Sequence, residues 1–337
     1  MRRIAVLNQK GGVGKTTTVV NVAAALAKAG CRVAVVDLDP QSHLTIHLGI
    51  EPESLEGGSY RVLLGGGNFE EELLLVRPNL WLVPANVNLV GAETELVSVV
   101  GRETILREAV AGADDKFDFL IIDCAPSLGL LTLNALAAAK EVLIPLQPHF
   151  LALQGFGKLL QTIDLVNKRI NPELKVKGIL LCMFDSRASL PKEVRADIEQ
   201  FLEQARGSNC AWSAARILPV AIRRNIKLAE APSYGQTIFE YAPACHGAQD
   251  YQQVAEFLLD EEGFCSRVEM PDFGRAEQPD MAATDEQLES HLGEGKSKQP
   301  VVEIQAVPQK LVQRVQSSSE SLQSGQGSAS KGESRQD

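Results

Sequence analysis

Short apolar runs recur along the chain and predict the strands of a buried sheet. Each run is nearly continuous rather than alternating with polar residues, which is typical of strands that are covered on both faces. The runs lie at residues 4–7, 32–37, 80–84, 117–123, 141–145 and 177–184.

Helical patterns alternate with these runs. Residues 18–30 predict the first helix, because apolar residues recur there at helical spacing and Gly30 ends the pattern. Further helices are predicted at residues 88–99, 101–112, 151–170, 191–205 and 246–261. Strands that alternate with helices predict a doubly wound α/β fold with a mostly parallel sheet.

Other stretches lack this regular pattern. Residues 51–78, which include Gly57-Gly58 and three glycines at 65–67, predict a variable surface region. Residues 265–337 are rich in Ser, Gln, Glu and Gly, and their apolar cluster at 301–315 is broken by Pro308. Such a composition cannot offset the entropy of ordering the chain. We therefore expect one α/β domain at residues 1–262 and a disordered, low-complexity tail at residues 263–337.

The segment between the first strand and the first helix carries a specific chemical signal. It reads Gln9-Lys10-Gly11-Gly12-Val13-Gly14-Lys15-Thr16-Thr17. A strand, a glycine loop ending in Gly-Lys-Thr, and a helix form the context of a phosphate-binding loop. The backbone N–H groups and the helix N-terminus would surround phosphate oxygens, Lys15 would reach the β- and γ-phosphates, and the Thr16 hydroxyl would ligate Mg²⁺. A glycine turn without a ligand is the alternative, and the flanking strand and helix argue against it.

Carboxylates end two of the predicted strands, at the edge where open α/β sheets hold ligands. Asp37 and Asp39 follow the second apolar run, and Asp123 ends the run at 117–123. An apolar strand that ends in Asp fits a Walker B motif, whose carboxylate holds Mg²⁺. The alternative for Asp123, capping of a helix that starts near Ser127, is compatible with metal binding. The alternative for Asp37 and Asp39 is loop solubility and helix capping.

Composition narrows the class of protein. The net charge of −10 argues against a generally basic nucleic-acid coat and leaves room for a local basic patch. The six cysteines form no Cys-x-x-Cys pair, which favours reduced thiols in a cytosolic protein. The most apolar region, residues 119–139, is interrupted by Asp123, Pro126 and Gly129, so it does not predict a membrane span.

Four separated motifs resemble those of the ParA/MinD ATPases and, in particular, of ParA/Soj partition proteins. The glycine loop resembles their deviant Walker A loop, because Gln9 replaces the ordinary first glycine and Lys10 is a second lysine within the loop. The other motifs are V-D-L-D-P-Q at 36–41, I-I-D-C-A-P-S-L-G-L-L-T-L-N-A-L at 121–136 and I-R-R-N-I-K-L-A-E-A-P-S-Y-G at 222–235. The resemblance covers about residues 1–262.

The resemblance implies roles in the chemistry for particular residues. Lys10 would reach the nucleotide of a second subunit when two monomers clamp two ATP molecules face to face. Asp39 would position or activate the attacking water, whereas Asp37 is interpreted as more structural. Asn225 would contact the nucleotide base, with Arg223 standing where proline is frequent in the family.

Two arginines fall on positions that resemble the DNA-contacting arginines of Soj-type proteins, namely Arg187 and Arg224. The alternative is that they are solvated or paired with nearby acids such as Asp185 and Glu230. The implied protein is a cytoplasmic, nucleoid-associated ATPase of chromosome or plasmid partitioning that uses ATP and Mg²⁺. Its ATP-dependent sandwich homodimer would bind DNA without sequence preference, and a ParB-like, centromere-bound partner would stimulate hydrolysis and release it.

Two other classes of ATPase share the deviant loop. A MinD-like, membrane-cycling ATPase needs a basic amphipathic terminal helix, which the tail sequence does not show. A metal-cluster ATPase needs paired cysteines, and Cys124 beside Asp123 has no second cysteine in a matching context, so we interpret it as a small buried residue. His43 and His47 are interpreted as ordinary surface or packing residues, because Leu44 stands where a zinc-binding His-Glu-x-x-His motif requires Glu.

Overall fold

The computed structural model describes residues 1–64 and 66–260, and of residues 150–154 the backbone alone. The predicted tail at 263–337, including the apolar cluster at 301–315, lies outside the described residues. The predicted domain boundary at residue 262 therefore stays a prediction.

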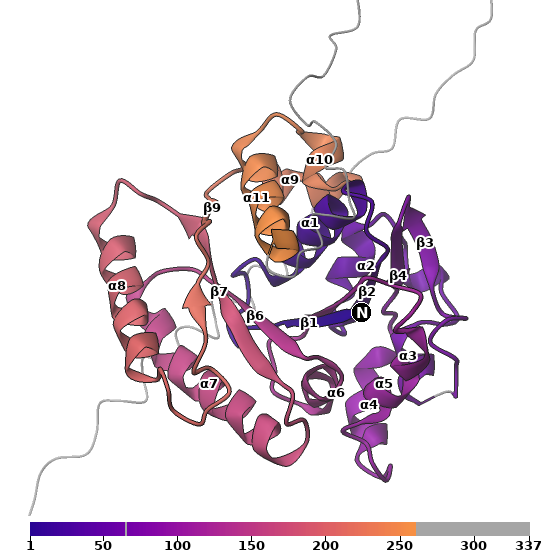
Figure 1. Cartoon of the computed structure of the whole chain (residues 1–337). Helices are drawn as coiled ribbons and strands as arrows, with labels where there is room; N and C mark the ends of the chain where they lie inside the picture. The colour runs from indigo at the N-terminus through magenta and orange to yellow at the C-terminus, as the bar shows by residue number, and fades with distance from the viewer. Residues whose placement is uncertain (65, 261–337) are drawn as a thin grey trace, which may run out of the picture. The chain divides into compact units, whose positions relative to one another are not determined.

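A nine-stranded sheet runs through the described part of the chain (Figure 1). Neighbouring strands are parallel, except that β3 and β4 are antiparallel. The predicted mostly parallel, doubly wound α/β fold is confirmed. The strand order is β3 (Leu74–Arg77), β4 (Leu80–Val83), β2 (Val33–Leu38), β5 (Phe119–Cys124), β1 (Arg2–Val6), β6 (Glu141–Leu146), β7 (Lys175–Phe184) and β8 (Arg216–Ile217), and β9 (Ile222–Arg223) also pairs with β7.

Helices cover both faces of the sheet and form a separate apolar core on each (Figure 1). One face carries α1 (Lys15–Lys28), α2 (His43–His47), α9 (Lys227–Glu230), α10 (Ile238–Tyr241) and α11 (His246–Asp260). The other carries α3 (Ser59–Leu63), α4 (Leu89–Leu96), α5 (Ile105–Ala109), α6 (Leu130–Ala138), α7 (Phe150–Arg169) and α8 (Ser189–Gln204). Short 3₁₀ turns lie at Pro52–Ser54, Ala111–Ala113 and Ala231–Tyr234.

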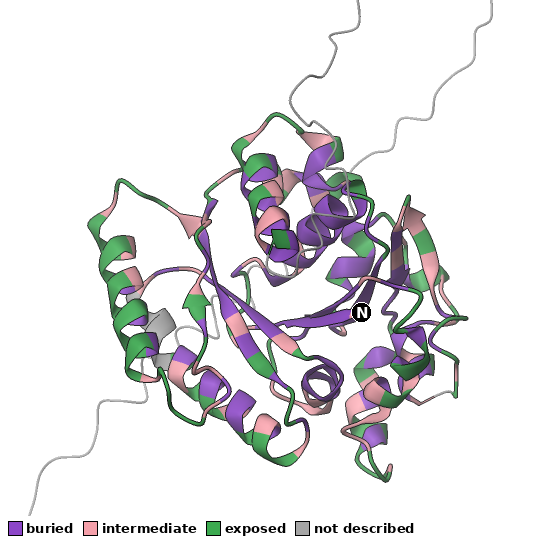
Figure 2. Cartoon of the chain, viewed as in Figure 1, coloured by how far each residue is buried: buried purple, intermediate pink, exposed green. Residues whose placement is uncertain are grey.

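Strand β1 explains why the apolar runs are continuous. Ile4 and Val6 pack into the core beneath α1 and α11, whereas Ala5 and Leu7 pack into the opposite core. Successive side chains of a strand point to opposite faces, so a strand between two helical layers needs apolar residues at every position. Figure 2 shows β1 buried along its length, in contrast to the exposed outer positions of α8.

The prediction of a variable surface region at 51–78 is wrong in part. The segment contains α3 and the antiparallel edge strand β3, and the side chains of Val62 and Phe69 are buried. The carboxylate of Glu72 is also buried, where it accepts a hydrogen bond from the Gly58 N–H and pairs with Arg61 at 3.2 Å. Elements of four or five residues are too short to show a period, so the glycines dominated the sequence pattern.

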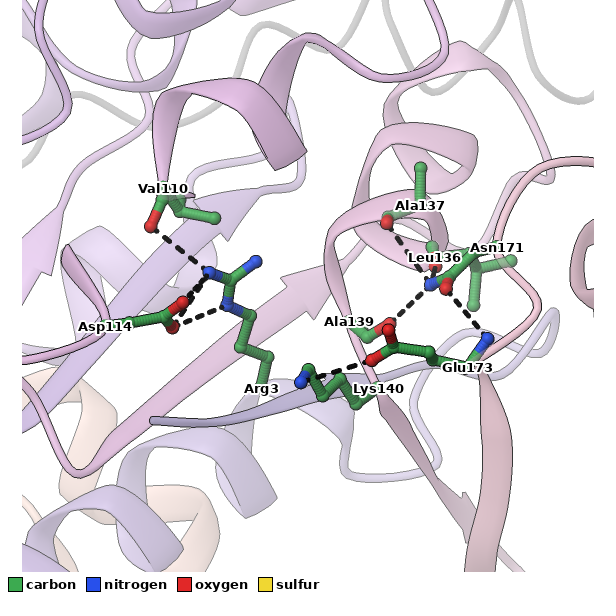
Figure 3. A network of polar contacts seen from close by, with 9 residues as sticks. All are labelled: Arg3, Val110, Asp114, Leu136, Ala137, Ala139, Lys140, Asn171 and Glu173. Carbon is green, nitrogen blue, oxygen red and sulfur yellow. Dashed lines mark hydrogen bonds and ion pairs between the residues drawn. The ribbon is translucent and has the colours of Figure 1, made fainter. Parts of the chain in front are cut away.

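Polar networks fix β1 and α6 at the edge of the sheet away from the glycine loop (Figure 3). Arg3 Nη2 donates to the Asp114 carboxylate at 2.8 Å. Asn171 Nδ2 lies within hydrogen-bond distance of carbonyls at the end of α6, which have no partner within the helix: those of Leu136 at 2.9 Å, Ala137 at 3.2 Å and Ala139 at 2.6 Å. The Lys140 N–H donates to the Arg3 carbonyl at 2.9 Å and joins the two networks.

Candidate functional site

The carboxyl ends of β2, β5 and β1 meet at one edge of the sheet. In the parallel register Val6 lies opposite Asp123, and Asp123 lies opposite Asp37. Because β5 lies between the other two strands, the residues that follow all three strands converge. Open α/β sheets hold their ligands at such an edge.

The glycine loop joins β1 to α1 at this edge. Gly12 has a φ of 71° and Gly14, which caps α1, has a φ of 94°, in the left-handed region that favours glycine. Beside Gly14 a Cβ would meet only Cys182, at 3.8 Å, so conformation rather than lack of space requires glycine there. The first N–H groups of a helix have no partner within it, and here they face the loop. These donors fit a phosphate group.

Lys15 is held inside the loop. Its side chain is buried, and its Nζ donates to the Lys10 carbonyl at 3.3 Å. Burial lowers the pKa of Lys15, and the charges of Asp123 and Asp39 act in the opposite direction. Within the described residues the ammonium group has no carboxylate in hydrogen-bond contact, which leaves it able to bind an anion.

Thr16 and Asp123 form a pair suited to a magnesium ion. The Thr16 hydroxyl donates to Asp123 Oδ2 at 2.7 Å, although the two residues are 107 positions apart. Asp123 Oδ1 is buried and has no hydrogen-bond partner within the described residues. Burial, and then the charge of Asp37, raise the pKa of Asp123 well above its ordinary value. A buried oxygen with no partner, next to a hydroxyl, fits a hard cation that completes its coordination with phosphate and water.

Asp37 and Asp39 follow one another closely but have different surroundings. Asp37 is fully buried, and its carboxylate accepts hydrogen bonds from the Thr45 N–H at 2.9 Å, the Thr45 hydroxyl at 2.7 Å and the Asp39 N–H at 3.1 Å. Within the described residues the Asp39 carboxylate accepts one hydrogen bond, from the Gln41 N–H at 3.0 Å, and Asp39 borders a cavity. These contacts agree with the more structural role predicted for Asp37.

A cavity of about 740 Å³ extends from the glycine loop to the segment at 222–232. Its lining contains most of the predicted nucleotide residues, namely Gly11, Gly12, Gly14, Lys15, Thr16, Thr17, Asp39 and Asn225. Three predicted residues lie outside this lining: Lys10, which is exposed, and Val13 and Asp123, which are buried. Asn225 lies 210 positions beyond Lys15 in the chain, so the fold alone brings the two together.

Arg223 is explained by its partner. Its backbone N–H donates to Asp250 Oδ2 at 2.9 Å, and its guanidinium pairs with the same carboxylate at 2.6 Å. A proline would supply neither donor. Asp250 thus anchors the segment that carries Asn225 to α11.

Several residues that line the cavity carry no sequence pattern that predicts a place there. His47 borders the cavity and is 2% exposed, and its Nε2 has no partner within the described residues. Tyr251 lies in hydrogen-bond contact with the Thr18 hydroxyl at 3.2 Å, and Cys182 lies beside Gly14. Each of the three lies far from the glycine loop in the sequence or within an apolar pattern that predicts packing. His47 is therefore buried, as the interpretation as a packing residue implies, but it also borders the cavity.

Within residues 1–64 and 66–260, no group of three or more His, Cys, Asp or Glu side chains is arranged to hold a metal ion. Cys124 is a small buried residue, as predicted. In the same part of the chain, no helix combines the length and apolar character needed to cross a bilayer.

Arg187 and Arg224 lie beyond the ends of two paired strands. Phe184 of β7 is opposite Arg223 of β9, and both arginines are exposed. Neither guanidinium has an ion-pair partner within the described residues: Asp185 accepts only the Arg187 backbone N–H, and Glu230 pairs with Lys227 at 2.9 Å. The alternative pairing expected for these arginines is absent from the described part of the chain.

The chain is similar to known proteins over most of its length. A model of the AAA domain family matches residues 1–176. The chain is 44% identical to the chromosome partitioning protein ParA of Myxococcus xanthus over 262 residues, which are 77% of this chain and 88% of that protein. It is 41% identical to the sporulation initiation inhibitor protein Soj of Bacillus subtilis, over 75% of this chain and 96% of that protein. The chromosome-partitioning ATPase Soj of Thermus thermophilus is 44% identical, over 77% and 96%.

Solved structures extend the comparison. A Mycobacterium smegmatis protein described as cobyrinic acid a,c-diamide synthase, with bound ADP and magnesium, has a TM-score of 0.65 and 39% identity, covering 78% of this chain and 97% of that one. The septum site-determining protein MinD of Pyrococcus horikoshii, complexed with Mg-ADP, has a TM-score of 0.61 at 23% identity, over 78% and 98%, and shows the fold alone. By the motifs, the geometry of the loop and the relatives over most of its length, this chain belongs to the ParA/Soj family of chromosome-partitioning ATPases.

Proposed function

We propose that this chain binds ATP with Mg²⁺, hydrolyses it, and uses the cycle to bind and release DNA as a dimer. The observation that carries the proposal is the Thr16–Asp123 pair beside the glycine loop, with a buried Asp123 oxygen that has no partner within the described residues. Thr16 and Asp39 border the same cavity. The Mycobacterium smegmatis protein, whose structure holds ADP and magnesium, supports it. Products of the reaction are ADP and phosphate.

The geometry supports a proposed role for each residue of the site. The amides of the loop, from Gly11 to Thr17, surround the phosphates, and Lys15 neutralises their charge. Thr16 and Asp123 hold the magnesium ion, which when bound supplies charge neutralisation and alignment for transfer of the γ-phosphoryl group to water. Asp39 orients that water through its second carboxylate oxygen, which has no hydrogen bond within the described residues. Asn225, on the far wall of the cavity, contacts the base.

A second copy of the chain completes the proposed cycle. Lys10 lies exposed at the mouth of the loop, where it can reach the nucleotide of the other copy. Loss of the γ-phosphate then removes a contact shared by the two copies, which makes nucleotide state a switch for assembly. A ParB-like partner that accelerates hydrolysis would release the dimer.

Arg187 and Arg224 form the proposed DNA surface. The chain carries a net charge of −10, but screening over roughly 10 Å limits each charge to its neighbourhood. Local cations can therefore bind phosphates by counterion release, and a dimer doubles their number. Binding of this kind has no sequence preference and implies association with the nucleoid.

The test measures ATP turnover and duplex DNA retention against salt, with and without a ParB-like partner. Asp39→Ala should keep ATP binding and DNA retention but stop turnover. Arg187→Glu with Arg224→Glu should keep the ATP-dependent dimer and lower the salt slope of log K by roughly 3 to 4, since each dimer loses four cations.

Arg195→Glu with Arg206→Glu is the matched control, because each of these arginines already forms an ion pair with a glutamate of α8. It makes the same charge change and should leave the salt slope as it is. Equal DNA loss in both double variants would place the effect in net charge rather than at Arg187 and Arg224. Unchanged turnover in Asp39→Ala would remove Asp39 from the reaction.

A further inference from the structure

Lys10 is exposed, yet it makes three hydrogen-bond contacts with other residues. Its backbone N–H donates to Asn8 Oδ1 at 3.0 Å, and its carbonyl accepts from Lys15 Nζ at 3.3 Å. Its Nζ is in hydrogen-bond contact with Nε2 of His149. An exposed lysine ordinarily samples many rotamers, so contacts to both the backbone and the ammonium group of one such residue are unusual.

The third contact comes from the connection between β6 and α7. His149 precedes α7, four residues beyond Pro145 of β6. Strand β6 itself also holds the residue before the loop, because Asn8 Nδ2 donates to the Pro145 carbonyl at 2.8 Å. The two strands are neighbours, with Val6 opposite Leu143. The position of His149 relative to the glycine loop is therefore set by the sheet.

The contact determines the protonation of the ring. A lysine ammonium group can only donate, so His149 Nε2 must accept and the imidazole must be neutral. The other polar contact of the ring is with its own backbone. Burial lowers the pKa of His149, and the Lys10 charge lowers it further. Lys10 is the charged side chain that acts on this ring among the described residues, the side chains of 150–154 being outside them.

We propose that His149 is a positioning residue for Lys10: its neutral imidazole holds the ammonium group at the mouth of the loop, ready for the nucleotide of a second copy. This inference rests on the proposed function of Lys10. An ammonium group has three donors, so Lys10 keeps its bond to His149 while it donates to phosphate oxygens. Holding the side chain beforehand reduces the entropy lost on assembly.

The proposal makes assembly depend on pH in one direction. A protonated ring has no acceptor at Nε2 and repels the lysine. Because the pKa of His149 is below its ordinary value of 6.5, the ring is neutral at about pH 7.5, and the dimer should weaken only as the pH falls below that ordinary value. A glutamine at this position can accept through its amide oxygen but does not titrate in this range.

The experiment measures the ATP-dependent dimer by light scattering in an Asp39→Ala background, which blocks the proposed hydrolysis. His149→Ala should weaken the dimer about tenfold, because each of two lysines loses its hold. His149→Gln should stay within about twofold of the parent at pH 7.5 and should lose the part of the pH dependence due to residue 149. His246→Gln is the matched control, since His246 is an exposed histidine at the start of α11, and it should keep the parental profile.

A second measurement separates this inference from the proposed function. The pKa of His149, followed by NMR in the full chain, should rise in Lys10→Ala because the neighbouring charge is gone. A parent that forms no ATP-dependent dimer would contradict the proposed function, whereas an unchanged His149 pKa in Lys10→Ala would contradict the contact. If Lys10→Ala loses the dimer and His149→Ala retains it at full strength, His149 does not position Lys10.

Discussion

The ends of β2 and β5 place two buried aspartates opposite each other, and the two differ in how their oxygens are satisfied. Asp37 accepts three hydrogen bonds from Thr45 and Asp39, whereas Asp123 accepts one, from Thr16, and keeps one buried oxygen without a partner in the described residues. A buried polar atom is costly unless it has a partner. A fully satisfied carboxylate therefore indicates a structural role, and a half-satisfied one indicates a place for a ligand.

The largest expected effect separates the two aspartates by activity. Asp123→Asn keeps the shape of the side chain and an acceptor for Thr16 but removes the negative charge that would hold magnesium. ATP turnover should fall by at least about 100-fold, or roughly 3 kcal/mol of lost stabilisation. The free energy of unfolding should stay within about 1 kcal/mol or increase, since burial disfavours the charged group.

Turnover and denaturant unfolding measured on the same preparation decide this point, with Asp185→Asn as an exposed control. Parental turnover in Asp123→Asn would show that Asp123 is not needed for the metal.

The second effect separates the same residues by stability. Asp37→Ala leaves the Thr45 N–H, the Thr45 hydroxyl and the Asp39 N–H without their acceptor inside the protein. The free energy of unfolding should drop by about 3 kcal/mol, because buried donors lose their partner. Chemical denaturation measures it, and Asp115→Ala, at an exposed position, should change stability by less than about 0.5 kcal/mol. Equal stability of Asp37→Ala and Asp115→Ala would contradict the structural role of Asp37 that distinguishes it from Asp123.

The third effect concerns His47, the last residue of α2, which follows β2 and Asp37 in the chain. Burial, above all, lowers the pKa of His47 from 6.5 to about 4. The unfolded chain therefore binds more protons between these values, so stability is present above pH 6.5 and is lost as the pH falls towards 4. The loss is at most about 3 kcal/mol.

Burial acts on Asp37 in the opposite direction, because it raises the pKa of that carboxyl from 3.8 to about 6. The folded state then binds the extra proton, so the contribution of Asp37 is full below pH 3.8 and is lost as the pH rises through about 6. Unfolding of the parent and of His47→Gln across this pH range isolates the histidine. If the free energy of unfolding of His47→Gln changed with pH as steeply as that of the parent, His47 would not titrate as its burial requires.

Much of the sheet was predictable because its signal is local. The apolar runs that became β1, β2, β4, β5, β6 and β7 are continuous, as strands covered on both faces must be. The glycine loop also depends on neighbours in sequence, since Gly14 caps the helix that Lys15 begins. The family prediction is confirmed by relatives over most of the chain. The missed elements, α3 and β3 among them, are too short to carry a period.

The sequence by itself thus determined the succession of the longer strands and helices along the chain, the loop and the family, because each of these rests on local patterns or motifs. The tertiary structure decided which of two similar aspartates keeps a free oxygen, and it joined residues far apart in the chain. Thr16 meets Asp123 across 107 positions and Lys10 meets His149 across 139. Such pairings arise from the order of strands in the sheet, which no local pattern encodes, because hydrophobic burial selects faces and not partners.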